Sequence, residues 1–199
     1  MFITLEGVDG AGKSSHLAWL EKWFQARGQR VCMTREPGGT PVGEKLRELV
    51  LHEAMHPETE ALIMFAARRE HLEQVIRPAL SAGEVVISDR FTDASFAYQC
   101  GGRGLPEARL ALLEHWVHAD LQPDLTFLFD LAPEIAAQRL ASARSPDRFE
   151  REKSDFHARV RTAYLRRSEQ FPQRIRIIDG NLGLDQVRQQ IANVLDKLA

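Results

Sequence analysis

The sequence predicts an α/β protein with a doubly wound, five-stranded parallel sheet and helices on both of its faces. Five short apolar runs alternate along the chain with longer segments of helical periodicity, which is the pattern of a parallel sheet with crossover helices. Polar and charged residues directly follow the apolar runs, where such sheets bind ligands. The 199 residues, 44% of them hydrophobic and 27% charged, suffice for one domain, and no repeat or linker divides them.

The first strand is expected at residues 1–6, because this run is apolar and of strand length. A helix follows, with Leu17, Leu20 and Phe24 on one face, and Gly28 is a typical residue to end it. The further strands are expected at 30–34, 84–88, 125–129 and 174–178. Further helices are expected at 42–51, at 58–82 with a break near Pro78, after the third strand to about residue 100, and at 106–119. Another helix should begin at Pro133, and a separate one should follow the polar stretch 142–153 and end at about residue 170. The last is expected at 184–198.

Composition also limits the partners and the compartment. The formal net charge of −2 gives no reason to expect nucleic acid as a partner. Cys32 and Cys100 are far apart and match no metal-binding spacing, so we expect reduced thiols. The sequence contains no apolar stretch of membrane-spanning length and no signal peptide pattern before the first strand. We therefore expect a cytoplasmic protein without a membrane partner.

The most informative motif lies between the first strand and the first helix. It reads Gly-Val-Asp-Gly-Ala-Gly-Lys-Ser over residues 7–14 and matches the phosphate-binding loop G-x-x-x-x-G-K-[ST]. Strand, loop and helix in this order are the context that the P-loop NTPase fold requires. Lys13 can reach the terminal phosphates of a nucleotide, and the Ser14 hydroxyl can bind Mg²⁺. The expected ATP-binding residues are Gly7, Val8, Asp9, Gly10, Ala11, Gly12, Lys13 and Ser14.

The loop alone does not separate an ATPase, a GTPase and a kinase. A GTPase should carry N-K-x-D after a strand, whereas the nearest segment here, Asn193–Asp196, reads N-V-L-D inside a predicted helix. A small-molecule kinase must screen the repulsion between two phosphate-bearing ligands, and therefore needs arginines from several segments. This chain offers such arginines at Arg35, Arg68, Arg69 and Arg90 and in the stretch from Arg144 to Arg151.

Six segments in family order carry a specific resemblance. They are Glu6–Ser14, Thr34–Thr40, Phe65–Arg69, Asp89–Phe91, Ala97–Gly104 and Asp147–Glu150. Together they resemble bacterial thymidylate kinase, in the branch whose lid carries arginines. The resemblance implies transfer of the γ-phosphoryl group of ATP to dTMP, giving dTDP and ADP on the way to dTTP. It also implies Mg²⁺ and a homodimer.

The resemblance implies a role for each matching residue at the dTMP site. At the acceptor phosphate, Arg90 would bind the phosphate and Pro37 would border it. At the sugar, Asp9 would face the 3′-hydroxyl and Tyr98 would crowd the 2′ position. At the base, Phe65 would stack on thymine, Arg69 would contact the base edge and Ser95 would hydrogen-bond the base, while Gln99 would lie beside base and sugar. Asp89 would organise the water molecules around Mg²⁺, which Ser14 would bind.

The positive charge at the transferring phosphoryl group needs a source outside the phosphate loop, since Val8, Asp9, Gly10 and Ala11 are not basic. A mobile lid at about residues 142–153 would then supply it. Arg144 is the first candidate and Arg148 the second, beside Lys13, Asp9 and Arg90 as the other expected catalytic residues.

Three alternatives remain open from sequence. The chain could be another phosphate-loop kinase, acting on a deoxynucleoside or on a different monophosphate. It could also be a nucleotide-switched binding module without an acceptor substrate, or a scaffold with a degenerate loop. The match of His52–His56 to the zinc motif H-E-x-x-H is expected to be a coincidence, because Pro57 disfavours helical geometry at His56.

Overall fold

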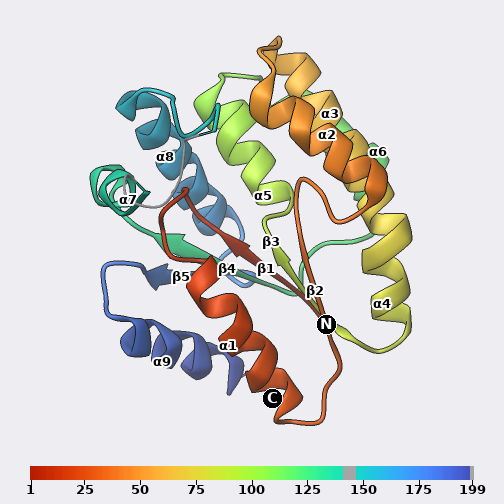
Figure 1. The fold of residues 1–199 in the computed structure, drawn as a ribbon, viewed down its shortest axis with the longest axis vertical. Helices are drawn as coiled ribbons and strands as arrows, with labels where there is room; N and C mark the ends of the chain where they lie inside the picture. The colour runs from red at the N-terminus through yellow and green to blue at the C-terminus, as the bar shows by residue number, and fades with distance from the viewer. Residues whose placement is uncertain (141–146, 198–199) are drawn as a thin grey trace.

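The computed structural model describes residues 1–140 and 147–197 and contains a five-stranded sheet in which all neighbouring strands are parallel (Figure 1). The order across the sheet is β2-β3-β1-β4-β5. The strands are β1 (Phe2–Glu6), β2 (Val31–Arg35), β3 (Val85–Asp89), β4 (Leu125–Asp130) and β5 (Ile175–Asp179). The central position of β1 places the phosphate-binding loop, which follows it, at the middle of the sheet.

Helices cover both faces of this sheet. Figure 1 shows α1 and α9 on one face, and α5 and α8 on the other. The predicted α/β fold with a parallel sheet is therefore confirmed. The helical elements are α1 (Ser14–Gln25), α2 (Pro41–His52), α3 (Pro57–His71), η1 (Leu72–Ile76), α4 (Arg77–Ser81), α5 (Thr92–Ser95), η2 (Phe96–Gly102), α6 (Glu107–His118), α7 (Pro133–Leu140), α8 (Ser154–Gln170) and α9 (Leu184–Leu195).

The core lies on the two faces of the central strands. All five residues of β1 are buried, and Ile3, Leu5 and Phe127 have no exposed surface. A strand buried on both faces is mostly apolar, which explains why the N-terminal run gave a clear strand signal. Within the described residues, none of the helices has both the length and the apolar character that a membrane span requires.

The long helix expected at 58–82 is divided into α3, the π-helical η1 and α4. Pro78 lies in the first turn of α4, where its missing N–H costs no hydrogen bond. A second π-helical segment, η2, continues α5. Apolar spacing carries no signal for the extra residue of a π-turn, so the sequence pattern did not predict these segments.

The carboxyl ends of the strands bring the predicted functional segments to one edge of the sheet. Leu5 pairs in register with Asp89, and Arg35 with Asp89 on its other side. The loop after β1, the turn after β2 and the segment after β3 are therefore neighbours. The predicted lid at about 142–153 lies partly outside the described residues, and Arg144 falls entirely outside them.

Candidate functional site

The phosphate-binding loop connects β1 to α1, so its backbone N–H groups and the helix N-terminus form an anion-binding site. Gly7 has a φ of +134°, and a Cβ atom there would lie 2.5 Å from the carbonyl oxygen of Phe129. Only glycine fits this close approach to β4. Lys13 is buried, and its Nζ donates to the carbonyl oxygens of Gly7 at 2.9 Å and Val8 at 3.1 Å. Ser14 begins α1 and is exposed.

Arg90 occupies a strained backbone position directly after β3. Its φ is +72°, a left-handed conformation that costs free energy for any residue other than glycine. The Arg90 N–H donates to the carbonyl of Leu5, and its own carbonyl accepts from the Ser88 hydroxyl at 2.7 Å. These two bonds hold the backbone in a conformation that directs the guanidinium toward the phosphate-binding loop.

The guanidinium of Arg90 joins the loop to helices on the other side of the site. Its Nη2 donates to Asp9 Oδ1 at 2.7 Å and to the Tyr98 hydroxyl at 3.0 Å, while Nη1 donates to the Tyr164 hydroxyl at 3.0 Å. Tyr98 in turn donates to Asp9 Oδ2 at 2.9 Å. The predicted residues Asp9, Arg90 and Tyr98 are thus brought into one hydrogen-bonded cluster.

The charges in this cluster set the ionisation of its acids. Burial alone would raise the pKa of Asp9, but the Arg90 and Lys13 cations, with hydrogen bonds from Arg90 and Tyr98, hold it well below the usual range. Glu6, at the end of β1, behaves in the opposite way. Burial, helped by the Asp93 carboxylate, raises the pKa of Glu6 to about 7, against opposition from Arg90 and from hydrogen bonds by the Tyr164 hydroxyl and the Phe91 N–H.

The raised pKa of Glu6 predicts a pH-dependent stability. The folded protein holds this proton more tightly than the unfolded chain, so the stabilisation is fully present below pH 4.5 and is lost as the pH rises through about 7. We expect the unfolding free energy of the parent, relative to Glu6→Gln, to fall by up to about 3 kcal/mol over this range. Denaturant unfolding of both proteins at pH 5, 6, 7 and 8 measures this difference, and parallel pH profiles would contradict it.

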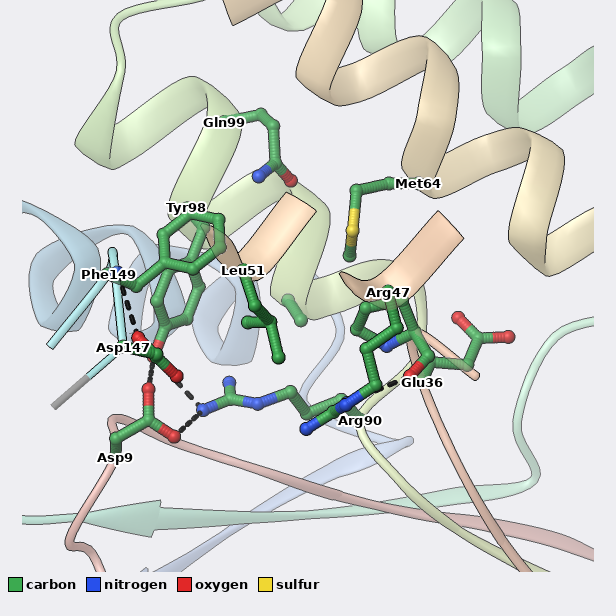
Figure 2. Close-up of a pocket in the computed structure, with 12 residues that line it drawn as sticks. Asp9, Glu36, Arg47, Leu51, Met64, Arg90, Tyr98, Gln99, Asp147 and Phe149 are labelled. Atoms are coloured by element: carbon green, nitrogen blue, oxygen red, sulfur yellow. Dashed lines mark hydrogen bonds and ion pairs between the residues drawn. The ribbon is translucent and has the colours of Figure 1, made fainter. Parts of the chain in front are cut away.

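A pocket opens beside the Arg90 cluster (Figure 2). It is lined by Asp9, Glu36, Pro37, Arg47, Leu51, Met64, Arg90, Ala94, Tyr98, Gln99, Asp147 and Phe149. Five of these, Asp9, Pro37, Arg90, Tyr98 and Gln99, are among the predicted acceptor-site residues. The lining contains two arginines, carboxylates, an amide and apolar side chains, which suits a ligand with an anionic group and a flat, partly apolar ring.

The structure does not bring Phe65 and Arg69 to this pocket, which corrects the expectation for both. Phe65 packs in a separate apolar cluster with Phe96 and Leu110. Arg69 is exposed and pairs with Glu73. The side chains of α3 that face the site lie one position earlier, because a shift of one residue rotates a helical side chain by about 100°.

Met64 and Arg68 take the places expected for Phe65 and Arg69. Met64 lines the pocket and Arg68 is completely buried beside it. The two pairs have the same spacing of four residues, so spacing gave no means to choose between them. Arg68 Nη2 donates to the Ser95 hydroxyl at 3.0 Å, and Ser95 therefore contacts Arg68 rather than lining the pocket.

The buried carboxylate of Glu36 holds Arg68 in place. Its Nε lies 2.7 Å from Glu36 Oε2, and His71 Nδ1 lies 2.9 Å from Glu36 Oε1. Burial would raise the pKa of Glu36, but Arg68 and His71 hold it below its usual value. Among the described residues, the remaining nitrogen of Arg68, Nη1, is buried without a hydrogen-bond partner. Such a donor is costly unless a ligand or water satisfies it.

Sequence reasoning also missed Arg47 and Leu51, which both line the pocket from α2. Arg47 Nη1 donates to the Pro37 carbonyl at 2.8 Å, and burial, with the nearby Arg35 cation, lowers the pKa of Arg47. The spacing of four residues between Arg47 and Leu51 was the available signal, since it places both on one helix face. Asp147 and Phe149, just after residues 141–146, also line the pocket and were also missed.

The candidate lid arginines are placed unequally. Arg148 is anchored away from the phosphate-binding loop, because its Nη2 donates to Glu60 Oε2 at 2.5 Å and its Nε to the Val50 carbonyl at 2.9 Å. Arg144 lies outside the described residues. Arg139 of α7 lies beside the loop, with Nη1 3.9 Å from where a Cβ atom of Gly12 would be.

The residues expected near Mg²⁺ fit a cation at the end of β3. Ser14 is exposed at the start of α1, and Asp89 Oδ1 is buried without a hydrogen-bond partner among the described residues. An unpaired carboxylate oxygen beside a phosphate-binding loop suits a hydrated divalent cation. The zinc-like motif does not form a site: His52 ends α2, while the His56 side chain accepts the Glu58 N–H at the start of α3.

Comparison with known proteins gives one consistent result. The thymidylate kinase family model matches residues 5–191. The thymidylate kinase of Methylobacillus flagellatus is 62% identical over 98% of this chain and 96% of its own. That of Nitrosomonas europaea is 59% identical over 98% of this chain and 92% of its own. The crystal structure of thymidylate kinase from Ehrlichia chaffeensis superposes with a TM-score of 0.77 at 30% identity and covers 98% of both chains.

These matches run over nearly the whole chain and agree with the phosphate-binding loop motif and the parallel sheet. The chain therefore belongs to the thymidylate kinase family, enzymes that transfer a phosphoryl group from ATP to dTMP.

Proposed function

We propose that the pocket beside Arg90 is the dTMP site and that the loop at residues 7–14 holds the ATP phosphates. The observation that carries this proposal is the Asp9–Arg90–Tyr98 cluster, because it joins the phosphate-binding loop to the pocket by direct hydrogen bonds. Arg90 and Arg47 would bind the acceptor phosphate from two sides. Asp9 would accept a hydrogen bond from the sugar 3′-hydroxyl, and Tyr98 would crowd the 2′ position of the sugar.

Two buried atoms without partners support thymine as the base. Arg68 Nη1 is an unpaired donor and Gln99 Oε1 an unpaired acceptor. On thymine, O4 is an acceptor and N3–H a donor, so the base complements both atoms. Met64 would pack against the ring, in the role that the resemblance assigned to Phe65. Ser95 would act on the base through Arg68.

Catalysis in this arrangement is positioning and charge neutralisation. Lys13 would leave the Gly7 and Val8 carbonyls to bind the donor phosphates. Arg90 would hold the acceptor phosphate in line for attack. We propose Arg144 as the lid arginine at the transferring group, within a lid at about residues 142–153 of a single kinase domain. Because Arg148 is bonded to Glu60 and to the Val50 carbonyl, we propose that it anchors the C-terminal part of that lid to the rest of the domain.

Mg²⁺ would neutralise charge between the donor phosphates when it is bound. Ser14 would contribute its hydroxyl, and Asp89 would accept hydrogen bonds from the water molecules of the cation. Cys32 and Cys100 are both unpaired, which supports a reducing compartment, and we propose that the enzyme acts in the cytoplasm.

The assignment of the acceptor site is tested by coupled ADP release with ATP and each nucleoside monophosphate in turn. We expect turnover with dTMP to exceed that with CMP, AMP and GMP, and Met64→Ala to raise the KM for dTMP at least about tenfold through lost contact with the base. The matched control is Phe65→Leu, one position further along α3, which should leave that KM within about threefold. The reverse order of the two effects would overturn the assignment.

We also propose a homodimer through α3 and α6. Leu62 is 54% exposed, Leu112 71% and Trp116 80%, and Leu62 and Leu112 line one shallow apolar groove. An exposed apolar patch of this kind is typical of a protein interface. The expected occupant is a second copy of the same chain, as the resemblance implies.

Substitution of Trp116 tests the dimer. We expect Trp116→Glu to raise the dimer dissociation constant at least about thirtyfold, because tryptophan is among the residues that contribute most to the binding energy of interfaces. Light scattering during size exclusion, over a dilution series, measures this shift. Leu184→Glu, on α9 and 46% exposed, is the matched control. A parent that is monomeric at every concentration would contradict the proposal.

A further inference from the structure

We infer that Glu60 determines base specificity through Gln99, by fixing the orientation of the Gln99 amide. This inference rests on the proposed dTMP site. Glu60 lies in the first turn of α3 and is completely buried. It does not line the pocket, whereas Gln99 does. Both of its carboxylate oxygens are bonded to protein donors, unlike the unpaired Arg68 Nη1, so its effect on the substrate must pass through another side chain.

The Glu60 carboxylate faces donors from three residues, two in or next to η2 and one after the α7 region of the chain. Its Oε1 accepts from Gln99 Nε2 at 2.8 Å, and its Oε2 accepts from Arg148 Nη2 at 2.5 Å. Arg103 Nε lies 3.4 Å from the same Oε2. The guanidinium groups of Arg148 and Arg103 can only donate, so Glu60 acts as the acceptor in this cluster.

A carboxylate that can only accept leaves one orientation for the amide that faces it. The NH₂ group of Gln99 must point at Glu60, and the carbonyl oxygen must point away from it. That oxygen, Oε1, is buried and has no partner among the described residues. Figure 2 shows the amide end of Gln99 directed into the pocket, with the oxygen on the side of Met64. The site therefore presents an acceptor that needs a donor from the ligand.

This polarity distinguishes the pyrimidines. Thymine carries N3–H, which can donate to Gln99 Oε1. Cytosine has a lone pair at N3 and an amino group at C4, so its N3 would face the Gln99 oxygen without a proton between them. Its amino group would likewise meet the donor Arg68 Nη1. A site built to satisfy a hydrogen bond rejects a ligand that leaves its buried groups unpaired.

Glu60→Gln is the direct test, because glutamine keeps the volume and can donate as well as accept. Its amide can turn its NH₂ group toward Gln99 and its oxygen toward Arg148, which allows Gln99 to flip. We expect kcat/KM for dTMP to fall about tenfold or more and that for dCMP to rise. The ratio of the two should fall at least about a hundredfold. A folded variant with a ratio within about threefold of the parent's would overturn the inference.

Arg148→Ala is the matched control, since it removes the other hydrogen-bond partner of Glu60 but leaves the carboxylate facing Gln99. We expect it to lower kcat without changing the ratio. A fall in its ratio as large as in Glu60→Gln would overturn the inference, because the lid and not the amide would then set the selectivity.

A measurement on the parent keeps the inference testable if Glu60→Gln does not fold. In protein labelled with [¹⁵N]glutamine, the two Gln99 amide protons should exchange slowly with solvent both without ligand and with dTMP, as expected of a group turned to a buried carboxylate. Protons that become protected only on addition of dTMP would overturn the inference.

Failure of the acceptor-site assignment gives a different result. In that case Gln99→Leu would leave dTMP turnover unchanged. If Gln99→Leu lost dTMP turnover while Glu60→Gln kept the parent's ratio of dTMP to dCMP kcat/KM, only the role of Glu60 would be rejected, and the acceptor-site assignment would stand.

Discussion

Replacement of Arg90 by alanine is expected to lower kcat/KM for dTMP about a thousandfold, a loss similar to that of an arginine that stabilises a phosphoryl transition state. The side chain supplies the charge that binds the acceptor phosphate, and it also neutralises Asp9 at 2.7 Å. Without it, the Asp9 carboxylate would face the incoming phosphate without its hydrogen-bonded counter-charge. Steady-state kinetics with dTMP varied at saturating ATP measure the loss.

Two further variants separate the contributions of Arg90. Arg90→Ala with Asp9→Asn should recover part of the affinity for dTMP, because the repulsive carboxylate is removed, although Asp9→Asn alone should weaken activity. Arg77→Ala, which removes a surface arginine paired with Asp120, should leave the kinetics unchanged. The KM for ATP in Arg90→Ala should stay within about threefold of the parent's. An unchanged kcat/KM for dTMP in Arg90→Ala would favour an acceptor without a phosphate, such as a deoxynucleoside.

Replacement of Asp93 by alanine is expected to give the largest loss of stability, about 3–5 kcal/mol. Asp93 is 3% exposed, and its Oδ1 accepts from Arg167 Nε at 2.9 Å while its Oδ2 accepts from Arg174 Nη1 at 2.6 Å. These bonds tie α5 to α8 and to the residue before β5. The variant would leave two arginines at a site that lacks their counter-charge.

Thermal unfolding measures this effect. For a chain of this size the loss corresponds to a fall in Tm of about 6–20 °C. Asp120→Asn, at the exposed pair with Arg77, is the matched control and should change Tm little. A Tm for Asp93→Ala within about 2 °C of the parent's would show that the buried cluster does not hold these elements together.

The strands and the phosphate-binding loop were predictable because each depends on local sequence. A central parallel strand is buried on both faces, so its apolar run marks it directly, and the glycines of the loop are required by positions such as Gly7. That Asp9, Pro37 and Arg90 would meet at one edge followed from the carboxyl ends of the strands, whereas Tyr98 and Gln99 were expected there only from the resemblance to thymidylate kinases.

The remaining features depend on packing that sequence spacing does not encode. The pairs Met64–Arg68 and Phe65–Arg69 have equal spacing, and only the contact of α3 with the Phe96 and Leu110 cluster determines which pair faces the site. Arg148 lies in the arginine-rich segment where a lid cation was expected, but it is bound by the buried carboxylate of Glu60, 88 positions away in the chain. Long-range partners of this kind leave no local signature.

The placement of dTMP against Met64 is the central claim, and methionine methyl NMR tests it most directly. The chain has four methionines, Met1, Met33, Met55 and Met64, and Met33 lines a different hollow beside Asp89. With ¹³C-methyl methionine and Met64→Leu to assign the signal, saturating dTMP should shift the Met64 methyl through the ring current of thymine and leave Met1 and Met55 in place. A Met64 signal that does not move at saturating dTMP would contradict the account.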